Sequence, residues 1–158
     1  MFTNHVLSKE GKIMKALITE EVNLVAEWVG ILSIEEYERY KEYIPNAHYW
    51  WWLRSPGATS DRAAYVAYDN ELNAFGEMVD NRLLGIRPAI RISNFSLKPG
   101  GVVIIGGKKW TVLSYNLLLA NEIVYPYSFN SDVESNVYKG SELEREVKNY
   151  WADLNAIL

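Results

Sequence analysis

Apolar residues recur with a helical period near the end of the chain. In the segment 141–154 the large apolar side chains fall on one face of a helix, and they are Leu143, Val147, Tyr150, Trp151 and Leu154. A single apolar stripe of this kind predicts an amphipathic helix that packs against a core. Ser141, with Glu144 three residues later, has the spacing of a capping box and marks the start of the helix.

A second helix is predicted over residues 34–43. Ser33 and Glu36 repeat the capping-box spacing just before this segment. The helix is expected to stop before Pro45, because a proline disfavours helical geometry in the residue that precedes it.

The other apolar residues alternate with polar ones or form short runs, which is typical of β-strands. Strands are predicted at 29–32, 49–57, 62–68, 85–92, 102–105 and 108–115. Pro88 lies inside one of these segments and implies an edge strand or a bulge. Asp69-Asn70 predicts a turn, and Gly106-Gly107 predicts the turn of a hairpin.

For three segments the pattern fits two kinds of secondary structure equally well. Residues 116–124 fit a strand or a short helix, and residues 71–84 fit a hairpin or an extended loop. Residues 13–29 fit a strand or a short helix that Thr19 would cap. With a long loop at 126–139, the pattern predicts an α+β domain with mostly antiparallel short strands and about two helices.

Length and composition narrow the class of protein. A chain of 158 residues has the length of one domain, so we expect a single domain over residues 1–158. It contains no cysteine, which excludes thiol chemistry and disulfides. The net charge is −4 and the basic residues are scattered, which disfavours direct nucleic-acid binding. The chain has neither an apolar signal segment nor an apolar run long enough for a membrane, so we expect a cytoplasmic location.

Patterns for catalysis and metal binding are weak. His5 and His48 are the two histidines, and neither accompanies a nucleophile motif. The polar segment 69–73 could supply calcium ligands, but Asp69-Asn70 is more typical of a turn. We therefore expect no enzyme activity, no metal and no cofactor.

A more specific signal comes from three short motifs. These are LSIEEY at 32–37, WWLRSPG at 51–57 and GIRPA at 85–89. They resemble a family of bacterial and phage domains of unknown function with a WWLRSPG and GVRPA signature. That family is similar in turn to C-type-lectin-like domains, including formylglycine-generating enzymes and the variable proteins of diversity-generating retroelements. The resemblance implies a C-type-lectin-like fold, but not the activity of the generating enzymes, because this chain lacks the cysteines that the activity needs.

The order of the motifs differs from the order in that family. Residues 102–158 resemble the family's first half, through stretches such as GGKKWTVL and NLLLANEI, and residues 10–93 resemble its second half. This order implies a circular permutation in which residues 94–101 connect the former ends. The permutation predicts that strands 86–92 and 102–105 lie side by side, and a structure in which they are not adjacent would refute it.

Two arginines and the tryptophan run have a structural interpretation. Arg54 and Arg87 are flanked by apolar residues, so they need carboxylate or carbonyl partners inside the fold. In an extended segment Trp50 and Trp52 would share one side and Trp51 would take the other, and at least one side must be core.

The resemblance also implies where a ligand would bind. In lectin-like folds the ligand surface lies between the signature and the closing strand, which corresponds here to residues 57–62 and 68–84. The candidate binding residues are Tyr68, Asp69, Asn70, Glu71, Asn73, Phe75, Glu77, Met78 and Arg82. Exposed aromatic and apolar side chains among them would suit a protein contact.

Two functions of different class follow. The first is a non-catalytic protein-binding module of a phage or mobile element, which inhibits a host defence nuclease such as a CRISPR nuclease. Its acidic helix residues would face a basic nucleic-acid channel. These residues are Glu35, Glu36, Glu38, Glu142, Glu144, Glu146 and Asp153. The alternative is a glycan- or receptor-binding lectin-like domain of a phage or bacterial surface protein, against which the missing signal segment counts.

Overall fold

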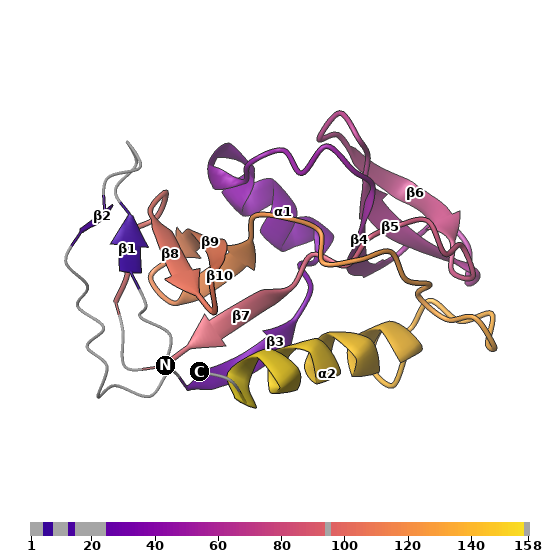
Figure 1. Ribbon diagram of the computed structural model, residues 1–158. Helices are drawn as coiled ribbons and strands as arrows, with labels where there is room; N and C mark the ends of the chain where they lie inside the picture. Colours follow the sequence, from indigo (N-terminus) through magenta and orange to yellow (C-terminus); the bar gives the residue numbers. More distant parts are fainter. Residues whose placement is uncertain (1–4, 8–12, 15–24, 94–95, 157–158) are drawn as a thin grey trace.

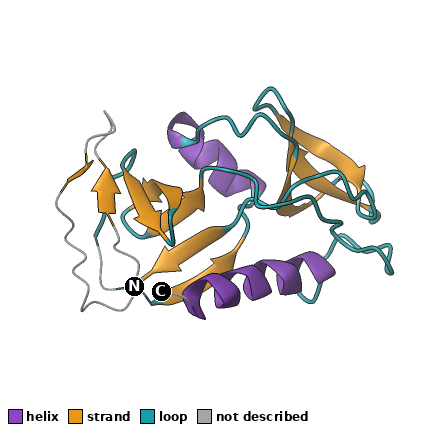
Figure 2. Ribbon diagram, viewed as in Figure 1, coloured by secondary structure: helices purple, strands orange, loops and turns teal. Residues whose placement is uncertain are grey.

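The computed structural model describes residues 5–7, 13–14, 25–93 and 96–156, and in this part the fold is α+β with two antiparallel sheets (Figures 1 and 2). The larger sheet has seven strands, in the order β2 (Ile13–Met14), β1 (His5–Leu7), β8 (Val102–Ile105), β9 (Lys108–Ser114), β10 (Leu117–Ala120), β7 (Ala89–Ile92) and β3 (Ala26–Gly30). The smaller sheet has three, in the order β4 (Trp51–Pro56), β5 (Arg62–Val66) and β6 (Leu72–Met78). The helices are α1 (Ile34–Tyr40), the 3-10 turn η1 (Lys41–Tyr43) and α2 (Glu142–Ala156).

Strand β10 is buried on both of its faces, and this places it at the centre of the molecule. Leu118 packs in the same core as Trp151 of α2, whereas Leu117 and Leu119 pack in the core that contains Tyr37 of α1. Alternate side chains of one strand point to opposite faces, so each face of the larger sheet has its own core. Figure 1 shows α2 running alongside β3.

The two sheets are joined through α1. Tyr37 of this helix is fully buried, and its ring meets the ring of Trp51 of β4 edge to face at 5.7 Å between centroids. The same core holds Leu113 and Leu117 of the larger sheet. Because Tyr37 packs with side chains of both sheets, α1 fixes the smaller sheet against the larger one.

Both predicted helices are confirmed, together with their caps. The Ser33 hydroxyl accepts a hydrogen bond from the Glu36 amide (3.1 Å), and the Glu36 carboxylate accepts one from the Ser33 amide (2.9 Å), which completes the predicted capping box. At α2 the Ser141 hydroxyl accepts from the Glu144 amide (3.0 Å). The Glu144 carboxylate, however, accepts from the amide of Gly140 and not from that of Ser141.

Most predicted strands are found with shifted ends. The hairpin of β8 and β9 turns at Gly106-Gly107, and both glycines have positive φ. Segments 71–84 and 116–124, for which the sequence allowed two structures, contain the strands β6 and β10. The segment 13–29 contains β2 and the start of β3, but Thr19 lies outside the described residues.

Two predictions about the closing segment are wrong. Only residues 89–92 of the predicted strand 85–92 form β7, and β7 lies between β10 and β3 and not at an edge. Pro88 comes just before β7 and accepts a hydrogen bond from the Ala120 amide (2.9 Å), but it has no amide to return, and Arg87 Nε donates to the Ala120 carbonyl oxygen instead. Strands β7 and β8 are separated by β9 and β10, so the pairing that the permutation predicts is absent.

Candidate binding surfaces

Arg87 has the structural role that its apolar neighbours predict. Its side chain is fully buried and donates hydrogen bonds to the carbonyl oxygens of Ala120 (2.7 Å), Pro45 (2.8 Å) and Asn121 (2.9 Å). The guanidinium also lies 4.8 Å from the ring centroid of Trp51. Burial lowers the pKa of Arg87 to about 10, since desolvation disfavours the charged form. Arg87 therefore ties the end of β10 and the segment at Pro45 to the tryptophan run.

Arg54 holds the start of α1 against β4. Its Nη1 donates to the carbonyl oxygen of Ile31 (2.7 Å) and to the Glu36 carboxylate, and its guanidinium lies 5.3 Å from the Trp28 ring. Arg91 approaches the other oxygen of Glu36 at 3.4 Å. Burial acts to raise the pKa of Glu36, but its hydrogen bonds and the two arginines hold that pKa below the ordinary value.

The three tryptophans of the run 50–52 divide between the core and the surface. Trp51 and Trp52 are fully buried on opposite sides of β4, in different cores, so both faces of this strand are covered. The Trp52 indole donates to the carbonyl oxygen of Tyr127 (2.7 Å). Trp50, which the sequence groups with the structural residues, has 44% of its surface exposed.

The predicted binding residues lie mainly along the β5–β6 hairpin, and they form two groups at its opposite ends. Residues 68–71 form the turn between the strands, whereas Phe75, Glu77 and Met78 lie toward the far end of β6, with Arg82 beyond it. Asn73 lies between the groups and donates to the Tyr65 hydroxyl (3.0 Å), so it faces the sheet. The structure does not bring the nine residues together into one site.

The turn end is held by local hydrogen bonds. Asn70 has a φ of 67°, a left-handed conformation that asparagine tolerates. The Asp69 carboxylate accepts from the Glu71 amide (3.1 Å), and the Tyr37 hydroxyl donates to the Asn70 carbonyl oxygen. These bonds fulfil the predicted turn, and Tyr68 projects from it with 55% of its surface exposed.

The other end of the hairpin projects Phe75 into solvent. Gly76 follows it with a φ of 97°, and the Asn73 side chain accepts from the Gly76 amide (3.0 Å). This irregular backbone leaves Phe75 with 61% of its surface exposed. The Arg62 guanidinium lies 5.0 Å from the centroid of the phenylalanine ring and donates to the Gly76 carbonyl oxygen (3.0 Å), so the ring is held in place from one side.

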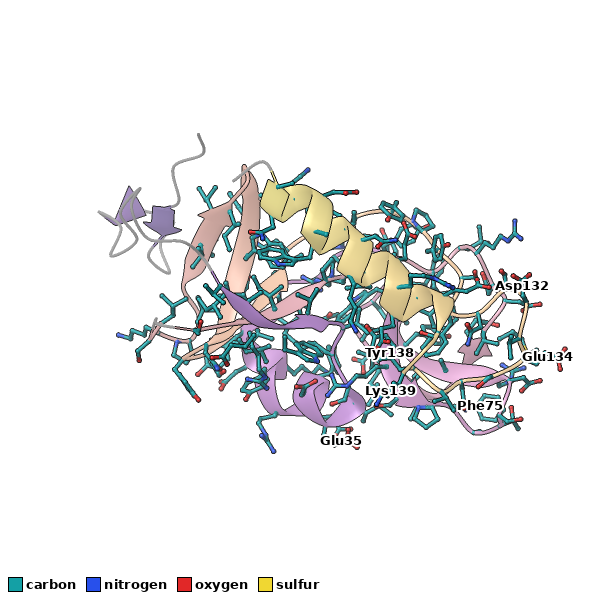
Figure 3. All side chains as sticks on the ribbon, turned by 90° about the horizontal axis from the view of Figure 1, so that it is seen from below. Glu35, Phe75, Asp132, Glu134, Tyr138 and Lys139 are labelled. Carbon is teal, nitrogen blue, oxygen red and sulfur yellow. The ribbon has the colours of Figure 1, made fainter. Side chains whose placement is uncertain are left out.

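A loop that the sequence did not select lies beside Phe75. Asn136 donates from its amide to the Ser60 carbonyl oxygen and from its side chain to that of Arg62, both at 3.0 Å. This docking holds the loop against the turn before β5, and Val133 and Val137 of the loop are 59% and 61% exposed. Figure 3 shows Asp132 and Glu134 of this loop at the same end of the molecule as Phe75.

We name this surface the Phe75 face, and we define it as Phe75 together with four exposed residues of the docked loop, which are Asp132, Val133, Glu134 and Val137. In the sequence, Val133 and Val137 are isolated apolar residues in the polar stretch 130–137. The resemblance places a ligand surface only at residues 57–62 and 68–84, and the fold brings the loop to this region.

Chemistry at other places has little support in the part of the chain that is described. No three histidine, aspartate or glutamate side chains there group around a position that could hold a metal ion. A cleft of about 600 Å³ lies between the β8–β9 turn, the segment 120–124 and Tyr150, and its ionisable groups are Lys108, Lys109, Glu122 and Tyr150. Burial raises the pKa of Tyr150, so this hydroxyl stays protonated at neutral pH. Neither described helix is long and apolar enough to span a bilayer.

Comparison with known families supplies an independent result. Residues 5–94 match the family model of DUF6273, a domain of unknown function. The matched segment contains both the tryptophan signature and the GIRPA motif. Comparisons with curated proteins and with solved structures gave no match. Because the family model covers more than half of the 158 residues, this protein belongs to the DUF6273 family.

Proposed function

We propose that this chain is a non-catalytic protein-binding module that contacts its partner through the Phe75 face. The observation that carries the proposal is the exposed Phe75 ring, which Arg62 holds in place, next to a docked loop in which Val133 and Val137 are also exposed. Single exposed apolar residues are common, but a group of them on a surface with fixed backbone marks an interaction site. An aromatic ring held by Arg62 loses little side-chain freedom on binding.

The charges around this face favour a basic partner. Asp132 and Glu134 are exposed within it, and Asp61 lies in the turn on which the loop docks. Arg62 is occupied by the Phe75 ring and the Gly76 carbonyl oxygen. An apolar centre with an acidic rim is complementary to a basic surface and repels nucleic acid itself. A nucleic-acid channel of a host nuclease has this chemistry, and the proposed role is its inhibition.

The helices present fewer free carboxylates to a basic partner than their sequences suggest. Glu36 pairs with Arg54 and Arg91, and the Glu142 carboxylate accepts from Ser131. Two further carboxylates are engaged, Glu144 with Lys148 and Glu146 with the hydroxyl of Tyr125. The carboxylates of Glu35, Glu38 and Asp153 lie at exposed positions. The acidic residues of the Phe75 face therefore support a basic partner better than the helices do.

We also propose that the fold is C-type-lectin-like and that the two halves of the chain stand in exchanged order relative to the family. The separation of β7 from β8 refutes a permutation in which these strands pair. One observation supports a looser form, in which the halves are exchanged without that pairing. Leu154 at the end of α2 packs in the same core as Ala26 at the start of β3.

The test of the proposed function is capture of a partner from host lysate by the wild-type chain and by the Phe75→Ser variant. We expect the wild type to retain one protein, a nuclease, in stoichiometric amount, and F75S to lose it. Met78→Ser, at a half-buried position beside the face, should weaken capture less. Tyr115→Ser is the matched control, since Tyr115 is as exposed as Phe75 but lies in the turn between β9 and β10.

Circular dichroism shows whether each variant is folded, so loss of capture is interpreted only for folded variants. Retention of the partner by folded F75S would refute the Phe75 face. Retention of polysaccharide alone would refute a protein-binding function and favour the glycan-binding alternative.

A further inference from the structure

A second exposed aromatic group lies at the end of the β5–β6 hairpin that is remote from Phe75. We name it the aromatic strip, and it consists of His48, Tyr49, Trp50 and Tyr68. Tyr49 packs on Trp50 at 5.9 Å between ring centroids, Trp50 on Tyr68 at 6.2 Å, and Tyr68 on His48 at 6.1 Å. Tyr68 is 55% exposed and Trp50 44% exposed, so the group forms a continuous series of rings that reaches solvent. Neither the fold nor the Phe75 face accounts for it.

The backbone under the strip is fixed from several directions. The Trp50 carbonyl oxygen accepts from the Gly85 amide (2.8 Å), which ties the strip to the closing segment. The Asn46 side chain accepts from the His48 amide (2.8 Å), and His48 has a φ of 54°, an uncommon conformation for a residue other than glycine. On the other side, the bond from the Tyr37 hydroxyl to Asn70 holds the turn that carries Tyr68. The rings are therefore presented by a rigid base.

We propose that the aromatic strip binds a proline-rich segment of a partner protein in the polyproline II conformation. Rings that meet edge to face leave shallow notches between them, and the pyrrolidine ring of proline offers a flat apolar surface that fits such a notch. A polyproline II helix has three residues per turn and advances about 3.1 Å per residue, so prolines three positions apart lie on one face about 9.3 Å apart and would contact different rings of the strip. Both partners are ordered before binding, which keeps the entropy cost low.

The polar edges of the strip suit the same ligand. A polyproline II segment makes no internal hydrogen bonds, so its carbonyl oxygens need donors. The indole N–H of Trp50 and the hydroxyls of Tyr49 and Tyr68 are donors at the edges of the rings. Indole and phenol groups thus provide both the apolar contact and the hydrogen bonds, without a buried charge.

Negative charge next to the strip favours a proline-rich ligand that carries a basic residue. Asp69 is exposed directly beside Tyr68, and the nearby Glu71 is partly balanced by Lys41 at 3.9 Å. The Asp69 carboxylate is therefore placed to pair with an arginine at the end of the bound segment. The same carboxylate disfavours nucleic acid, although stacked bases would also fit aromatic rings.

The experiment is a calorimetric titration of the full chain with a synthetic proline-rich peptide that carries one terminal arginine. Saturable binding is expected for the wild type. Removal of a central aromatic anchor should weaken it at least about tenfold in Trp50→Ala and in Tyr68→Ala. Tyr115→Ala is the matched control, because Tyr115 is equally exposed outside the strip, and its affinity should be unchanged. Asp69→Asn should weaken binding a few-fold and reduce its salt dependence.

Several results would overturn the proposal. These are absence of saturable binding by the folded wild type, equal affinity of W50A and the wild type, and equal affinity for a peptide in which glycine replaces each proline. Binding of a chitin or cellulose oligosaccharide that W50A abolishes, without peptide binding, would assign the strip to glycans instead. The proposal does not rest on the Phe75 face, and F75S should bind the peptide as the wild type does.

Discussion

Arg87 links two segments, residue 45 and residues 120–121, to the tryptophan run, and this explains why an arginine can stay buried without a carboxylate partner among the described residues. Its three hydrogen bonds go to main-chain carbonyl oxygens, and the one of Ala120 faces Pro88, which has no amide to donate to it. The Trp51 ring adds a cation–π contact. The sequence predicted partners of this kind from the apolar neighbours of the arginine, but the identity of the carbonyls depends on loops that are remote in sequence.

Replacement of Arg87 should therefore destabilise the protein. Arg87→Met removes the cost of burying a charge but leaves three carbonyl oxygens without their donor, among them that of the buried Ala120, and we expect the second effect to be larger. We expect the free energy of unfolding to fall by about 2–4 kcal/mol. The urea midpoint gives this value, and Arg82→Met, at an exposed arginine, should change it by less than about 0.5 kcal/mol. An R87M variant as stable as R82M would contradict the role of Arg87.

Tyr37 makes a second prediction at the residue scale, on pH. Burial raises the pKa of Tyr37 to about 12, which is above the value of about 10 for an unfolded chain. The folded state then binds more protons than the unfolded state between these values, so stability is constant below about pH 10 and falls as the pH rises toward 12. Burial also raises the pKa of Tyr125 and Tyr138, which adds to the fall.

Urea titrations at neutral and alkaline pH measure this effect. Tyr37→Phe should be less stable than the wild type at neutral pH, because it loses the hydrogen bond to Asn70, and its stability should depend less on alkaline pH. An identical alkaline dependence in both proteins would show that Tyr37 does not contribute.

At the scale of elements, local signals predicted helices better than strands. The capping box at Ser33 and the hydroxyl cap at Ser141 involve residues three positions apart, so local sequence contains the information needed to start each helix. The limits of β7 depend instead on Pro88 and on its neighbours β10 and β3. The exposure of Trp50 was missed for a similar reason, because alternation cannot show where a strand begins when both of its faces are buried.

The irregular end of the β5–β6 hairpin gives a prediction about an element. A Cβ atom on Gly76 would lie 2.7 Å from the Ala63 carbonyl oxygen, whereas one on Gly107 would meet nothing within 4 Å. Both glycines have positive φ, so both Gly→Ala changes introduce backbone strain. Gly76→Ala should lose at least about 1 kcal/mol more stability than Gly107→Ala, because only the first adds a clash with backbone. Equal urea midpoints would contradict this geometry.

At the scale of the whole molecule, the order of strands could not be predicted from the sequence. Strand β10 pairs with β7, which precedes it by more than twenty residues, and such distant pairings leave no periodic signal. The two binding surfaces were hidden for the same reason. The Phe75 face combines β6 with the loop 131–140, and the aromatic strip combines Trp50 with a turn from another hairpin.

The exchanged order of the two halves can be tested with a chain that joins them in the opposite order. A chain in which residues 102–156 are followed directly by residues 25–93 should fold, because the end of α2 and the start of β3 share one core. We expect cooperative urea unfolding and the near-ultraviolet circular dichroism of the native aromatic core. A chain that keeps helical signal but lacks this aromatic signal would show that the halves are not interchangeable.

The affinity of the purified partner for the wild-type chain, for Phe75→Ser and for Tyr115→Ser tests the central claim most directly. Loss of an exposed aromatic anchor should weaken binding by at least about tenfold in F75S and leave Y115S like the wild type. Added salt should weaken the wild-type complex, since acidic residues of the Phe75 face meet a basic surface. Equal affinities of the three folded proteins, with no effect of salt, would contradict binding through the Phe75 face.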